Sequence, residues 1–186
     1  MSHHAFSVVV VCLALVTPSS GLAGSVDTKR IPKATVDALH QQFLMGEVLT
    51  IVKASHDRAS SQAHLRARTE RFKFLGTQQQ EPMTIDGYTV QDLASPIVGY
   101  SLFYHGNNGP LVILYASVNP LQPAAVDKIS DLIARSFDSV STPDGSRLYF
   151  LGIYDLDPTR VIKIMVRKGS TSLGPDYAIG YAVSGR

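Results

Sequence analysis

Residues 97–118 read IVGYSLFYHGNNGPLVILYASV, and the two apolar runs in this segment flank a Gly-Asn-Asn-Gly sequence. Glycine and asparagine readily adopt the positive φ angles that a tight turn between antiparallel strands requires. We therefore expect a β-hairpin whose strands are Ile97–His105 and Leu111–Val118.

The turn of this hairpin sets which side chains point the same way. The segment allows more than one two-residue turn, and these turns differ by a register shift of two residues. Such a shift keeps every side chain on the same face of the hairpin. Both faces are then apolar, and we expect the hairpin to be covered on both sides. One face is expected to carry Tyr100, Leu102, Tyr104, Leu111, Ile113 and Tyr115, and the other Phe103, His105, Val112 and Leu114.

The sequence after the hairpin predicts one helix and three more strands. Pro120 and Pro123 precede a pattern of apolar residues at helical spacing that runs to about Asp138. Strand-like runs then cover residues 147–154, 160–167 and 177–183.

Two of these three runs alternate in a way that predicts what covers them. The run at 160–167 alternates apolar and mostly charged residues, which is typical of a strand with one face in water. The last run has one bulky face and one almost bare face, which admits either a helix or a ligand, with helix packing as the default. The alternating sets are Ile162, Ile164 and Val166 against Lys163, Met165 and Arg167, then Tyr177, Ile179, Tyr181 and Val183 against Ala178, Gly180 and Ala182.

The sequence before the hairpin predicts two helices. Apolar spacing indicates a first helix from Pro32 to about Ser55, and a second from about Ala59 to Leu75 that Gly76 would end. Residues 77–95 are polar and rich in turn formers, so we expect a connector with one short strand near 88–90.

Together these elements predict one α+β domain over residues 24–186. The expected sheet is mostly antiparallel with about five strands, built from a hairpin, a helix and a three-stranded meander. The two N-terminal helices are expected to pack on it.

The N-terminus predicts export. An apolar run from Phe6 to Val16 is too short to span a bilayer, but it fits a signal peptide that is cleaved after Ala23. Cleavage would remove Cys12, the only cysteine, so no disulfide is expected. We therefore expect a periplasmic or secreted protein of a bacterial envelope, with an uncleaved anchor or a buried core segment as the alternatives.

Basic residues gather in one part of the chain. The net charge of +2 is too small to indicate nucleic-acid binding. Residues 24–75 nevertheless contain nine Lys and Arg against five Asp and Glu. We expect either a solvated helix face or a site for an acidic protein, an acidic polysaccharide or an anionic lipid surface. The candidate binding residues are Arg58, Arg66, Arg68, Arg71 and Lys73.

The segment Asp155-Leu156-Asp157-Pro158-Thr159 resembles the nucleophile motif of haloacid-dehalogenase-type phosphatases. The resemblance implies a nucleophilic Asp155, an acid/base Asp157 and Mg²⁺. The context departs from that family, because only 27 residues follow Thr159 and a further strand begins at once. A hairpin turn with a capping aspartate accounts for the same residues.

The histidines outside the expected signal peptide carry no metal-binding or catalytic motif. His56 and His64 would approach each other only if one helix ran through both, and Ala59-Ser60-Ser61 suggests a break. His105 lies beside a Gly-rich turn but lacks the sequence context of a general base. We therefore expect no metal and no cofactor.

These observations favour an exported, non-catalytic binding or interaction module. Two alternatives remain: a small exported hydrolase that uses His105 or the Asp155/Asp157 pair, and a membrane-surface protein held by the basic helix.

Cleavage after Ala23 leaves Gly24 as the first residue of the exported protein. This site puts small residues at both the −3 and −1 positions just beyond the apolar run. N-terminal sequencing of protein recovered from the periplasm or the medium checks it. An intact Met1 in that fraction would contradict the export prediction.

Overall fold

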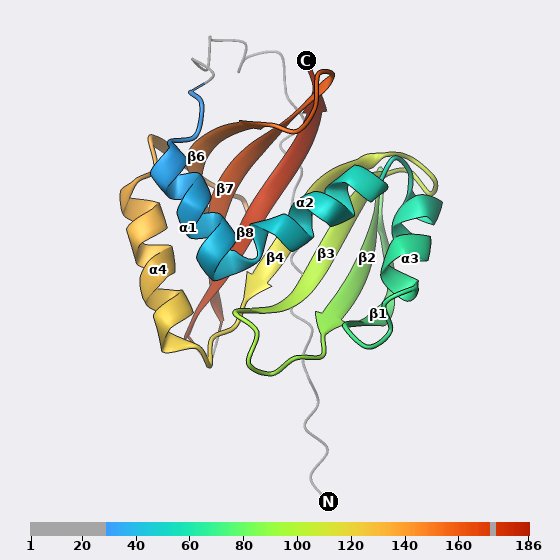
Figure 1. Cartoon of the computed structure of the whole chain (residues 1–186), viewed down its shortest axis with the longest axis horizontal. Helices are drawn as coiled ribbons and strands as arrows, with labels where there is room; N and C mark the ends of the chain where they lie inside the picture. Colours follow the sequence, from blue (N-terminus) through green and yellow to red (C-terminus); the bar gives the residue numbers. More distant parts are fainter. Residues whose placement is uncertain (1–28, 172–173) are drawn as a thin grey trace, which may run out of the picture.

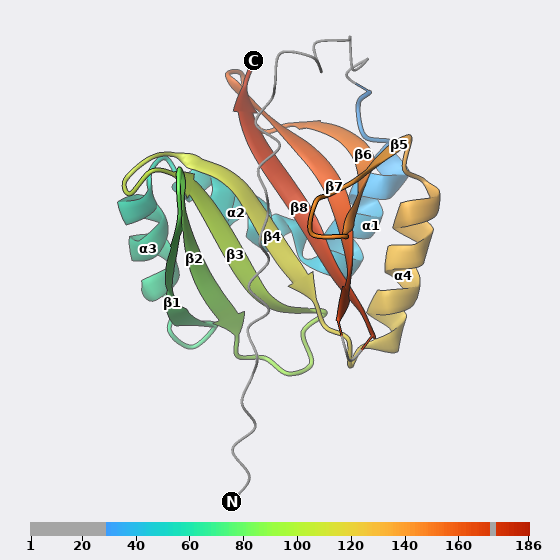
Figure 2. The same cartoon turned by 180° about the vertical axis from the view of Figure 1, so that it is seen from behind.

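The structure of this protein is a computed structural model that describes residues 29–171 and 174–186. The expected signal peptide and its cleavage site after Ala23 lie outside these described residues. Within them, the helices all lie on one face of a single antiparallel sheet, as two opposite views show (Figure 1, Figure 2).

The described residues form an eight-stranded sheet with the order β1-β2-β3-β4-β8-β7-β6-β5. The last strand of the chain, β8, lies inside the sheet between β4 and β7. The pairing of β4 with β8 therefore joins the early and late strands into one sheet. The strands are β1 Phe72–Gln80, β2 Met83–Val90, β3 Ile97–His105, β4 Leu111–Val118, β5 Asp138–Ser141, β6 Arg147–Asp155, β7 Arg160–Thr171 and β8 Gly174–Gly185.

Four helices are found in the described ranges. Leu44 separates the first two, because its left-handed backbone, with φ 55°, ends one helix and begins the next. The third helix is capped by Asp57, whose side chain accepts a hydrogen bond of 2.7 Å from the backbone N–H of Ser60. The helices are α1 Lys33–Phe43, α2 Met45–Ala54, α3 Arg58–Arg66 and α4 Pro123–Ala134.

The main core fills the space between the helices and the sheet. Its side chains come from both layers, and they include Leu39, Phe43, Ile51, Tyr100, Leu102 and Tyr181. A smaller apolar cluster lies on the opposite face of the sheet and consists of Met83, Ile85, Phe103, Tyr115 and Ala178.

The chain is α+β, but the expectation of about five strands with two N-terminal helices is wrong. Two of the additional strands, β1 and β2, occupy the expected helix end and connector. The polar residues 78–80 of β1 lie at the edge of the sheet, where side chains can meet water. In β2, Thr84 and Asp86 are buried at positions where an amphipathic strand pattern would have apolar residues.

Both expected N-terminal helices are shorter than the apolar spacing predicts. The helix expected from Pro32 to Ser55 is broken at Leu44. The helix expected from Ala59 to Leu75 ends at Arg66, and a turn in which the Arg71 N–H bonds the Arg68 carbonyl leads into β1. Arg66, Arg68, Arg71 and Lys73 therefore do not share one helix face.

The strand bounds of the hairpin are confirmed as β3 and β4. The expected facing holds for Leu111, which lies opposite Tyr104 and faces the helices, but it is wrong from Ile113 onward. Leu102 lies opposite Leu114, so both point toward the helices. A bulge between Phe103 and Tyr104 shifts the register by one residue, which a simple two-residue turn would not do. Ile113 therefore points away from the helices, together with Phe103.

The bare face of β8 is covered by neighbouring side chains, so the expectation that a helix packs there is wrong. The helices pack on the bulky face, where Ile179 and Tyr181 are fully buried. On the bare face, a Cβ at Gly180 would lie 2.8 Å from Cε1 of Tyr115 and 2.9 Å from Cγ of Met165. Glycine at this position therefore lets two large side chains approach the strand.

The face of β7 that was expected to be exposed to solvent is exposed only in part. Lys163 is exposed, but Met165 and Arg167 are each 6% exposed. The Arg167 guanidinium forms ion pairs with Asp144 at 3.1 Å and with Asp176 at 3.2 Å. Asp144 belongs to the turn between β5 and β6, so this turn is held against β7.

Gly180→Ala is expected to lower the free energy of unfolding by about 1–3 kcal/mol, because the added methyl group overlaps the side chains of Tyr115 and Met165. Gly185→Ala, in the same strand, is the matched control, since no heavy atom lies within 4 Å of a Cβ there. Urea unfolding of both variants measures the difference. Equal stability of the two would contradict this packing.

Candidate anion-binding site

The structure divides the five candidate basic residues into two groups. Arg58 and Arg71 form ion pairs with carboxylates of the chain, with side chains 18% and 25% exposed. For Arg66, Arg68 and Lys73, the described residues provide no ion pair within 4.0 Å. Only the second group is available to bind an external anion.

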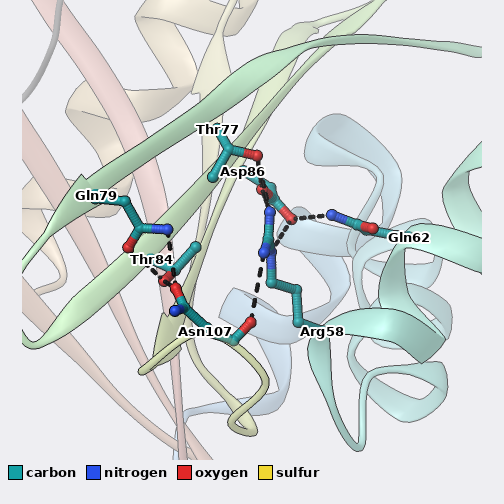
Figure 3. A network of polar contacts seen from close by, with 7 residues as sticks. All are labelled: Arg58, Gln62, Thr77, Gln79, Thr84, Asp86 and Asn107. Atoms are coloured by element: carbon teal, nitrogen blue, oxygen red, sulfur yellow. Dashed lines mark hydrogen bonds and ion pairs between the residues drawn. The ribbon is translucent and has the colours of Figure 1, made fainter.

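Arg58 neutralises a fully buried carboxylate (Figure 3). Asp86 has no exposed surface, and its carboxylate accepts two hydrogen bonds of 2.8 Å from the Nε and Nη2 atoms of Arg58. Thr77 Oγ1 and Gln62 Nε2 donate further hydrogen bonds at 2.6 and 2.9 Å. Burial raises the pKa of Asp86, but these hydrogen bonds outweigh it and hold the pKa below its ordinary value.

A second set of hydrogen bonds extends this network to the loop between β3 and β4 (Figure 3). The Gln79 amide donates to Asn107 Oδ1 at 2.9 Å, and the Thr84 hydroxyl contacts the side-chain oxygens of both residues. Arg58 Nη1 donates to the Asn107 carbonyl at 3.4 Å. Arg58 is therefore a structural residue that joins α3, β1, β2 and this loop.

Arg71 is structural as well. Its guanidinium lies 2.9 Å from a carboxylate oxygen of Glu47 in α2 and 3.5 Å from one of Asp92. Glu47 also accepts a hydrogen bond from the hydroxyl of Tyr100, a core residue of β3. Side-chain hydrogen bonding to Glu47 raises the pKa of Arg71, so the guanidinium stays charged at any physiological pH.

The two exposed cations Arg66 and Lys73 lie beside a cavity of about 230 Å³ between α3, β1 and β2. The Arg66 guanidinium sits 5.2 Å from the centroid of the Phe74 ring. The Phe74 ring in turn lies 5.2 Å from the ring of Tyr88. The cavity is lined by Leu65, Arg66, Thr69, Phe72, Lys73, Phe74, Tyr88 and Gln91.

Tyr88, which lines this cavity, and His64, which precedes the lining residue Leu65 in α3, contribute no charge near pH 7. Burial, assisted by the charge of Asp86, raises the pKa of Tyr88 to about 12, so the phenol stays neutral. Burial, assisted by the charge of Arg68, lowers the pKa of His64, which keeps that imidazole neutral near pH 7. The cavity thus combines an apolar lining with a rim of two cations, which suits an anion that carries an apolar group.

The aspartates of the phosphatase-like motif form ion pairs and hydrogen bonds within the described structure. Asp155 pairs with Arg30 and lies 2.6 Å from a guanidinium nitrogen of Arg186. Asp157 accepts hydrogen bonds from Arg160 and Thr159, which hold its pKa below the usual range. The segment forms the turn between β6 and β7, so the hydrolase alternative would require chemistry from carboxylates that are already paired.

The histidines do not converge on a site. His56 precedes α3, His64 lies near its end, and His105 is exposed at the end of β3. In residues 29–171 and 174–186, no three His, Cys, Asp or Glu side chains are grouped so that they could hold a metal ion.

Comparison with protein-family models, with curated proteins and with solved structures finds no match to this chain. Among the helices of the described ranges, none is long and apolar enough to cross a bilayer.

The cations of the cavity are among the candidate residues in the sequence, whereas its apolar lining is not. Phe72 and Phe74 were assigned to a helix, where they would have pointed in different directions. In β1 they are two residues apart and so point to the same side, toward α3. Their alternation with Lys73 is the sequence signal that a strand prediction could have used.

Arg58→Met is expected to lower the free energy of unfolding by about 3–5 kcal/mol, because it leaves Asp86 buried without its counter-charge. Arg68→Met removes a charge that has no such partner and should change stability by about 0.5 kcal/mol or less. Urea unfolding at neutral pH compares the two. Similar losses would show that the division into structural and free arginines is wrong.

Proposed function

We propose that this protein is an exported, non-catalytic binding module that takes an anionic, partly apolar ligand at the cavity between α3 and β1. The observation that carries the proposal is the Arg66 guanidinium, which lies over Phe74 at a cavity lined by Leu65, Phe72 and Phe74. The exposed Lys73 is also one of the lining residues. Export rests on the apolar run at 6–16 and the small residues that precede Gly24.

The size of the cavity limits what it can hold. A volume of about 230 Å³ lies below the range of about 300–1,000 Å³ that is typical of sites enclosing a drug-sized ligand. The cavity therefore suits one end of a ligand, such as a ring or the end of a chain, while the rest remains outside. Cations at the rim then lie where the charged part of the ligand would emerge.

The electrostatic contribution should depend strongly on salt. Both rim cations are partly solvated, and the screening length falls from about 10 Å at 0.1 M salt to about 3 Å at 1 M. The apolar contribution is not screened in this way. Binding that weakens with salt but does not vanish would therefore report both parts of the site.

The probe for this test is anilinonaphthalene sulfonate, an aromatic anion whose fluorescence rises in apolar surroundings. We expect saturable binding at neutral pH that weakens at high salt, and an affinity at least tenfold lower in the double variant Arg66→Glu/Lys73→Glu. The matched control is Lys163→Glu/Lys168→Glu, which makes the same change in charge at two exposed positions of β7. Equal affinities of the two double variants would overturn the proposal, and melting temperatures verify that both are folded.

A further inference from the structure

Two leucines are almost completely exposed. Leu93 is 89% exposed and Leu121 is 85% exposed, whereas Leu75 comes next among the large hydrophobic side chains of the described residues at 50%. Single exposed apolar residues are common on protein surfaces. Two almost fully exposed leucines on loops that are joined to each other are less common.

The two leucines lie on loops that one buried side chain holds together. Asn119 is 3% exposed, and its amide donates hydrogen bonds to the Leu93 carbonyl at 3.3 Å and to the Ser95 carbonyl at 2.9 Å. Its side-chain oxygen accepts a hydrogen bond of 3.0 Å from the Leu121 N–H. The backbone N–H of Asn119 also bonds the Pro96 carbonyl at 2.8 Å. The leucines are thus presented from an ordered support.

These loops adjoin the anion-binding site. The connections α3–β1, β2–β3 and β4–α4 all lie at the lower end of the molecule in Figure 1. The Gln91 side chain donates a hydrogen bond to the Thr69 carbonyl, and its N–H bonds the Arg71 carbonyl at 3.0 Å, which joins the first two connections. Thr69 and Gln91 also line the cavity.

The cations at this end outnumber the carboxylates that contact or adjoin them. Arg66, Arg68 and Lys73 have no ion pair with the described residues. Arg71 lies 2.9 Å from Glu47 and 3.5 Å from Asp92, so its one charge offsets only one of these two carboxylates. Glu70 is exposed in the same turn and opposes the cations with a single charge. A surface that combines protruding apolar side chains with adjacent cations is complementary to an anionic lipid bilayer.

We propose that the Leu93–Leu121 end, defined by the 91–96 and 119–122 loops, docks on an anionic phospholipid bilayer. The two leucines enter the boundary between head groups and acyl chains, while Arg66, Arg68 and Lys73 face the head groups. That the cavity holds part of one lipid rests on the function proposed above; the docking itself rests on the leucines. Two leucines and three cations give reversible attachment rather than permanent anchoring.

The first test is sedimentation with vesicles of phosphatidylcholine that contain phosphatidylglycerol. We expect Leu93→Ser/Leu121→Ser to reduce the partition coefficient at least tenfold, while Leu75→Ser, on edge strand β1, leaves it near that of the unchanged protein. The leucine double variant should still bind anilinonaphthalene sulfonate. Loss of vesicle binding with probe binding retained supports docking through these loops, whereas unchanged vesicle binding overturns it even if the cavity binds the probe.

The second test uses the absence of tryptophan from the chain. Leu121→Trp introduces a single reporter, whose emission should shift to shorter wavelength on the anionic vesicles and be quenched by lipids with brominated acyl chains. Leu75→Trp is the control and should show neither change. Emission of the Leu121→Trp variant that stays as in water, or no binding by the unchanged protein, would overturn the proposal and leave a protein partner as the occupant of this surface.

Discussion

The carboxylate of Asp86 is a charge placed in the interior of the protein, and its surroundings are arranged to keep it there. An isolated charge of this kind is very unfavourable unless it is paired and hydrogen-bonded. Arg58, Thr77 and Gln62 supply these contacts, and they belong to α3 and to the edge strand β1. The need to pair and hydrogen-bond Asp86 therefore fixes α3 on β1 and β2, the two strands at one edge of the sheet.

The cavity depends on this arrangement. It is bounded by β1 and β2 on one side and by the C-terminal end of α3 on the other. Arg58 lies at the N-terminal end of α3 and ties that helix to the sheet. A helix that packed only through Leu65 and Ser61 would have fewer constraints on its orientation. The buried ion pair thus supports the position of Arg66, which lies at the other end of the same helix.

The elements that were predicted correctly from the sequence are those whose buried residues are also the apolar residues of the strand pattern. β3 and β4 are apolar runs around a glycine-rich turn, and their bounds were predicted as they occur. β1 was missed, and of β2 only a short strand near residues 88–90 was expected. Asp86 is a buried charge and residues 78–80 are polar at an edge, so the alternation does not continue along the whole of either strand.

The candidate site was predictable only in part, for a related reason. The density of arginine between residues 58 and 71 marked the region, but the local sequence does not contain the distant partners Asp86 and Glu47, so it could not separate structural cations from free ones. The sequence places Leu93 in a polar connector and Leu121 between two prolines, but it does not show that both side chains are exposed. Their exposure follows from loop conformations that Asn119 sets across the two connections.

Asp155 has a consequence for how the molecule would stand on a surface. It contacts both Arg30 and Arg186, so the first described residues and Arg186 lie close together. They are at the upper end in Figure 1, opposite the β2–β3 and β4–α4 loops. A fluorescent protein or an affinity tag joined after Arg186 would extend from the far side. Labels attached there would leave the lower loops unobstructed and would report the height and tilt of the molecule.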